Sequence, residues 1–113
     1  MMANAGVPAA NGGNLYENAL PPAQGERFEQ LLQHRNLVIE RIISSTAVTP
    51  TTFVQAQDEW VVLLQGEAEL DVAGKRMQLK AGDYVFIPSA TPHTVLRASQ
   101  GALWLAVHLP PNS

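Results

Sequence analysis

The feature that most constrains the fold is a series of short, strand-like segments that fills the chain from Leu37 onward. Leu37–Ile43 is rich in β-branched residues, which favour extended strands. Similar segments follow at Thr46–Val54, Glu59–Gln65, Glu67–Val72, Lys75–Leu79, Tyr84–Ile87, His93–Ala98 and Ala102–Leu109. About eight short strands with turn residues at close intervals are typical of an antiparallel sandwich or a small barrel. We therefore predict an all-β domain.

The segment Glu59–Gln65 carries apolar residues on both of its faces. Side chains alternate across a sheet, so Glu59 shares one face with Val61 and Leu63, and Trp60 lies on the other. We expect the first face to be the barrel interior. The second face then needs a cover, which we expect to be a helix of this chain, a second subunit, or both. This reasoning predicts a homodimer, with cover by the chain's own helix alone as the alternative.

The chain before the strand series has a different character. Residues 1–22 begin with Ala, Asn and Gly and have little to bury, so we interpret them as a flexible arm that precedes a barrel domain at 23–113. Phe28, Leu31 and Leu32 recur at i, i+3 and i+4, the spacing of one helix face. This spacing predicts one short helix.

Composition and charge exclude several classes of function. The net charge is −3 and Lys and Arg are not clustered, which argues against binding to nucleic acid. No apolar run approaches the ~20 residues that span a membrane, and no secretory signal is evident, so we expect a cytoplasmic protein. Because there is no cysteine, disulfides, thiolate zinc sites and thiol catalysis are excluded.

The stretch 81–93 is the best candidate for a functional site. A Gly82-Asp83 turn leads into Tyr84–Ile87, and Pro88 ends that run because proline has no N–H for a sheet ladder. A loop of small residues then places His93 at the start of the next segment. Loops held by a rigid scaffold often carry function, so we expect His93 to face a site at the rim of the barrel.

These residues resemble the second sequence motif of the cupin family. That motif is Gly, five residues, Pro, one residue, Gly, two residues, His, three residues, Asn. Gly82, Pro88 and His93 stand at these spacings, whereas Ala90 replaces the second glycine and Arg97 replaces the asparagine. The first cupin motif contains His-x-His, then Glu and Gly.

The first motif is only partly present. Glu59 and Gly66 match it, whereas Phe53 and Gln55 stand in place of the two histidines and Ala47 replaces a leading glycine. The resemblance covers about residues 37–109. It implies a cupin-like double-stranded barrel, or jelly roll, to which we add the arm and the short helix.

The resemblance also implies a divalent metal, since the family holds one through the two histidines, the glutamate and the second-motif histidine. Carried over, Glu59 and His93 are the standard ligands, and Gln55 would add its amide oxygen. Phe53 offers no ligand atom. Iron, manganese, nickel or zinc would then support oxygenase-, isomerase- or decarboxylase-like chemistry on a small molecule.

A second hypothesis comes from Arg97. It lies four residues after His93, so strand alternation would place both on one face. A guanidinium stays protonated, repels a bound dication and binds carboxylates or phosphates bidentately. The alternative is therefore a metal-free module that binds a small anionic ligand through Arg97 and His93, with Gln55 as a further contact. Both an enzyme and a binding protein are compatible with these residues, as is an interaction domain that uses its apolar outer face.

The remaining histidines are given lesser roles. His108 shares a face with Trp104 and Ala106 on the last segment, and we favour a structural role for it over a site role. His34, which follows the predicted helix, is interpreted as a surface residue.

Overall fold

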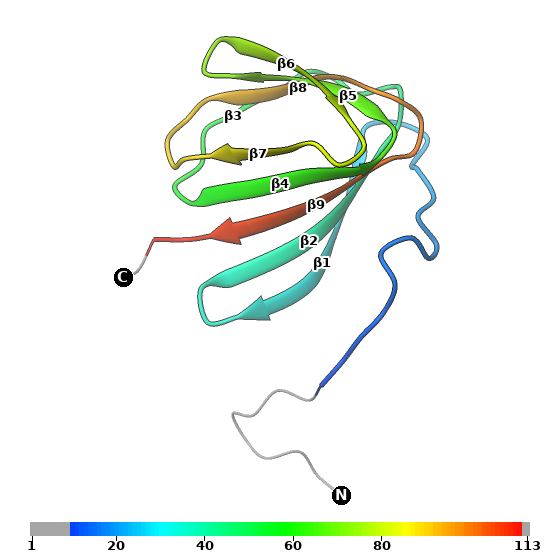
Figure 1. The fold of residues 1–113 in the computed structure, drawn as a ribbon, viewed down its shortest axis with the longest axis vertical. Helices are drawn as coiled ribbons and strands as arrows, with labels where there is room; N and C mark the ends of the chain where they lie inside the picture. Colours follow the sequence, from blue (N-terminus) through cyan, green and yellow to red (C-terminus); the bar gives the residue numbers. More distant parts are fainter. Residues whose placement is uncertain (1–9, 112–113) are drawn as a thin grey trace, which may run out of the picture.

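The computed structural model describes residues 10–111, which form nine strands and no helix. The strands are β1 (Glu26–His34), β2 (Leu37–Ser44), β3 (Thr52–Phe53), β4 (Asp58–Gln65), β5 (Glu67–Val72), β6 (Lys75–Lys80), β7 (Tyr84–Ile87), β8 (His93–Ala98) and β9 (Ala102–Leu109). They form two antiparallel sheets, ordered β1-β2-β9-β4-β7 and β3-β8-β5-β6, that face each other as two layers (Figure 1). The predicted all-β jelly roll is confirmed. Within the described chain, no helix is long and apolar enough to cross a membrane.

The predicted helix is wrong, because Glu26–His34 is a strand that pairs along its length with β2. Phe28 lies opposite Ile42 and Leu32 lies opposite Ile39, with a register shift between Gln30 and Leu32. The shift inserts an extra residue, so apolar residues of this strand recur at a spacing that a helix also gives. The hydrogen-bond ladder to β2 outweighs the weak local preference for a helix.

The strand expected at residues 46–54 is reduced to β3, of which only Thr52 and Phe53 pair with β8. Pro50 lies just before it and has no N–H to donate to a ladder. Of the arm predicted at residues 1–22, Met1–Ala9 lie outside the described residues. The division of the chain at residue 22 stays a prediction.

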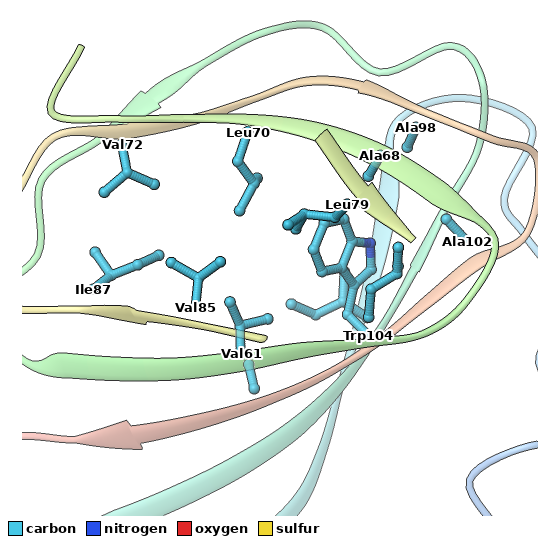
Figure 2. Close-up of a cluster of buried hydrophobic side chains, with 13 residues drawn as sticks. Val61, Ala68, Leu70, Val72, Leu79, Val85, Ile87, Ala98, Ala102 and Trp104 are labelled. Atoms are coloured by element: carbon cyan, nitrogen blue, oxygen red, sulfur yellow. The ribbon is translucent and has the colours of Figure 1, made fainter. Parts of the chain in front are cut away.

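The core lies between the two sheets, where their inward-facing side chains meet (Figure 2). On β4, Val61 and Leu63 are buried whereas Trp60 is on the outside, as strand alternation predicts. The buried cluster consists of Ile42, Val61, Leu63, Ala68, Leu70, Val72, Leu79, Val85, Ile87, Ala98, Ala102, Trp104 and Ala106. This core fills one part of the space between the sheets and leaves a cavity beside it.

The outer face of the larger sheet is covered in part by the chain's own N-terminal segment. The Arg41 guanidinium donates hydrogen bonds to the carbonyl oxygens of Leu15, at 2.8 Å, and Glu17, at 2.6 Å. It also pairs with the carboxylate of Glu29 on β1. This segment, rather than a helix, lies against β1 and β2.

Further along the same outer face, apolar side chains are exposed. Trp60 on β4 and Tyr84 on β7 pack their rings with centroids 5.6 Å apart, and Phe86 lies opposite Trp60 in the register. All three are exposed in the single chain. The homodimer predicted from this face stays a prediction.

Candidate functional site

A cavity of about 100 Å³ lies between the sheets, at the end of the barrel where β4 and β8 begin and β9 ends. This end is on the left in Figure 1. The polar residues that line the cavity are Glu26, Glu40, Gln55, Glu59, His93 and His108. Most of its other lining is apolar or aromatic, and includes Trp104 from the core.

Three of the residues singled out in the sequence meet in this cavity. The amide nitrogen of Gln55 donates to Glu59 Oε1 at 2.8 Å and lies 3.3 Å from His93 Nε2. Glu59 Oε1 and His93 Nε2 are 3.7 Å apart, and the whole of Glu59 is only 8% exposed. We call these residues the Gln55–Glu59–His93 cluster.

Strand geometry explains why these residues converge. Glu59 is the second residue of β4 and points inward with Val61. His93 is the first residue of β8 and lies opposite Phe53 of β3, so the turn after β3 carries Gln55 to the same place. The amide orientation of Gln55 is fixed by Gln57, whose Nε2 donates to Gln55 Oε1 at 2.7 Å.

The tautomer of His93 follows from its other nitrogen. His93 Nδ1 lies 3.0 Å from the carbonyl oxygen of Thr91, which can only accept a hydrogen bond. The Nδ1 atom therefore carries the proton, and in the neutral ring Nε2 presents a lone pair to the cavity. Gln55 thus donates toward two acceptors, Glu59 and His93.

His108 is a site residue to which the sequence analysis gave too small a role. Its Nε2 is 2.8 Å from Glu40 Oε1, and its Nδ1 is 3.9 Å from Glu59 Oε1. The hydrogen bond to Glu40 raises the pKa of His108, burial lowers it, and the charges of Glu59 and Glu40 raise it further. The sequence signal that could have identified His108 is strand alternation, because His108 shares a face with the buried Trp104.

Glu26 was also missed, since the region around it was taken for a helix. Its carboxylate accepts a 2.6 Å hydrogen bond from Ser44, whose hydroxyl oxygen accepts one from Trp104 Nε1 at 3.0 Å. Burial raises the pKa of Glu26, the Ser44 hydrogen bond lowers it, and the charges of Glu40 and Glu59 raise it.

Arg97 does not line the cavity, so the prediction that it shares the face of His93 is wrong. The ladder between β5 and β8 shifts register so that Val95 pairs with Leu70 but Arg97 pairs with Glu69. This bulge turns Arg97 to the outside, where its side chain is 63% exposed and its Nε lies 3.8 Å from Glu69 Oε1.

The residues present do not fit the usual cupin metal site. Within residues 10–111, no group of three or more His, Cys, Asp or Glu side chains is arranged to hold a metal ion. The amide nitrogen of Gln55, rather than its oxygen, faces Glu59 and His93, and a nitrogen that donates hydrogen bonds is not a metal ligand. Phe53 packs its ring 6.0 Å from that of His93 and supplies no ligand.

Comparison with known proteins places this geometry in context. The sequence model of the cupin domain matches residues 43–108. None of the curated proteins compared with the chain matches it. A crystal structure from Ralstonia eutropha JMP134, named as a candidate mannose-6-phosphate isomerase, is 30% identical with a TM-score of 0.79, covering 90% of this chain and 100% of that one.

Two further solved structures share the fold at lower identity. An RmlC-like cupin from Desulfovibrio desulfuricans has a TM-score of 0.79 at 22% identity, covering 92% of this chain and 100% of that one. KdgF from Halomonas sp. has a TM-score of 0.71 at 18% identity, covering 79% of this chain and 82% of that one. At these identities the likeness concerns the fold alone.

Proposed function

Because this chain belongs to the cupin family, we propose that its barrel cavity binds a small organic molecule through the Gln55–Glu59–His93 cluster. The observation that carries the proposal is the convergence of these three polar side chains on a cavity with largely apolar walls. Small-molecule sites are concave and mostly apolar, with a few placed polar groups that fix orientation.

The cluster favours a ligand that brings hydrogen-bond donors. The Glu59 carboxylate only accepts hydrogen bonds, and the tautomer of His93 with its proton on Nδ1 presents the lone pair of Nε2. A hydroxyl or amino group of a ligand would replace the Gln55 amide as the donor to either atom. The anionic ligand that the sequence suggested loses support, because Arg97 is outside the cavity and three carboxylates line it.

Ligand binding can be tested by NMR with the full-length protein. We would titrate neutral alcohols of about four to six non-hydrogen atoms and follow the indole N–H of Trp104 and the ring of His93. We expect shifts at both groups, weaker binding in His93→Ala and unchanged binding in His34→Ala. His34 is exposed and does not line the cavity. Shifts confined to the outer face, or no shifts at all, would refute the proposal.

The divalent metal implied by the family is tested separately. Tag-free protein is dialysed against a chelator and titrated with Mn²⁺ and with Zn²⁺, and the bound metal is measured. Because only Glu59 and His93 offer standard ligands in the cluster, we expect weak, sub-stoichiometric binding. Stoichiometric binding that is lost in both Glu59→Gln and His93→Ala would show instead that the cluster is a metal site.

A further inference from the structure

We propose that the cavity selects a small organic cation, an amine, over neutral or anionic molecules of the same shape. This inference rests on the proposed binding function and names the ligand class for it. It follows from the charges that line the cavity, from its aromatic walls and from its size.

The charges are unbalanced in favour of a cation. Glu26, Glu40 and Glu59 line the cavity, and among residues 10–111 no lysine or arginine does. His108 Nε2 lies 2.8 Å from Glu40 Oε1, so this carboxylate balances any positive charge that the His108 ring carries. Glu26 and Glu59 are left with neutral hydrogen-bond donors, the Ser44 hydroxyl and the Gln55 amide.

Glu59 is the group that gains most from a cationic ligand. Its side chain is 10% exposed, and its Oε1 atom lies 3.7 Å from His93 Nε2 and 3.9 Å from His108 Nδ1. A buried carboxylate is costly unless it is paired with an opposite charge. An ammonium group would supply a charge-assisted hydrogen bond, which is shorter and stronger than the one from an amide.

The walls and the size of the cavity fit the same class of ligand. Phe28, Phe53 and Trp104 line it, and aromatic faces attract cations more strongly than neutral groups. A cavity of 150 Å³ accommodates benzene, so a cavity of about 100 Å³ suits roughly four or five non-hydrogen atoms. Isobutylamine has this size and carries one ammonium group.

The test uses isobutylamine and isobutanol, which have the same shape, and isobutyrate, an anion with one more non-hydrogen atom. The affinity of each for the full-length protein is measured by NMR titration. We expect isobutylamine to bind about tenfold more tightly than isobutanol, and isobutyrate to bind least. If isobutanol binds as tightly as the amine, or if isobutyrate binds best, this inference is overturned while the binding function stands. If none of the three compounds shifts the NMR signals of residues that line the cavity, both this inference and the proposed binding function are refuted.

Two variants assign the preference to the cavity carboxylate. Glu59→Gln should reduce the advantage of isobutylamine over isobutanol to less than twofold, because the substitution removes the charge and keeps an oxygen that accepts hydrogen bonds. Glu67→Gln removes the same charge from an exposed residue that does not line the cavity, and should keep the preference. If Glu59→Gln does not fold, Glu26→Gln tests the second carboxylate in the same way. A preference that survives removal of both carboxylates overturns the inference.

Discussion

Replacement of Ser44 by alanine tests the buried hydrogen bonds beside the cavity. Ser44 is fully buried, accepts a 3.0 Å hydrogen bond from Trp104 Nε1 and donates a 2.6 Å bond to Glu26 Oε2. In the variant, Trp104 Nε1 has no partner, which costs about 1–3 kcal/mol, and loss of the bond to Glu26 costs about 1 kcal/mol more. The expected loss in the free energy of unfolding is therefore about 2–4 kcal/mol near neutral pH, or roughly 8–16 °C in melting temperature.

The penalty should depend on pH because Ser44 also acts on Glu26. Burial raises the folded-state pKa of Glu26 above its ordinary value of 4.5, and the Ser44 bond opposes this rise. A carboxyl with a raised folded-state pKa destabilises the fold once it ionises, so stability falls as pH increases from the unfolded pKa to the folded one. Ser44→Ala raises the folded pKa further and enlarges this loss. The variant should therefore be closer to wild type in acid than at neutral pH.

Urea unfolding followed by tryptophan fluorescence at several pH values measures both effects. Ser45→Ala is the matched control, because Ser45 is equally buried and donates to the carbonyl oxygen of Gly25 at 2.9 Å. It should lose stability without the additional pH dependence, since it has no bond to Glu26. A loss below about 0.5 kcal/mol for Ser44→Ala, or a loss that is the same at every pH, would refute the reasoning.

Three further predictions concern other parts of the molecule. The pKa of His108 is raised by its hydrogen bond to Glu40, so this pair stabilises the fold fully below the ordinary histidine pKa of 6.5 and loses that contribution as pH rises through the folded-state pKa. His108→Gln should flatten the plot of unfolding free energy against pH in this range. An unchanged plot would contradict the role assigned to the pair. A Cβ on Gly66 would lie 2.5 Å from the side-chain oxygen of Ser99, whereas one on Gly74 would meet nothing within 4 Å, and both glycines have positive φ. Gly66→Ala should therefore lower the melting temperature more than Gly74→Ala does. Equal decreases would argue against the clash with Ser99. Analytical ultracentrifugation should find a dimer for the wild type and a monomer for Trp60→Glu, and a wild-type monomer would exclude dimerisation through the outer face.

Much of the fold could be predicted because its signals are local. The turn residues and β-branched segments mark strands, and alternation along β4 separates the buried Val61 and Leu63 from the outer Trp60. The spacing of the second cupin motif places His93 at the start of β8, where the structure has it.

The two main errors have one physical cause, the β-bulge. In β1 an extra residue between Gln30 and Leu32 makes the apolar spacing look helical. In the β5–β8 ladder a register shift between Glu69 and Leu70 turns Arg97 away from the cavity. A bulge shifts strand parity by one residue, and its position depends on pairing with a distant strand rather than on local sequence.

Side-chain alternation along a strand therefore predicts which face a residue lies on only as far as the nearest bulge. This limit decides which site residues could be predicted from the sequence. Glu59 and His93 each lie two residues from an inward-facing valine, Val61 or Val95, with no bulge between, and both point into the cavity. His108 stands in the same relation to the buried Ala106, and it lies opposite Glu59 in the register of β4 and β9. The same rule that placed Glu59 thus also places His108 in the cavity. It was the assumption that an isolated histidine is structural, rather than the geometry of the strand, that left His108 out of the predicted site.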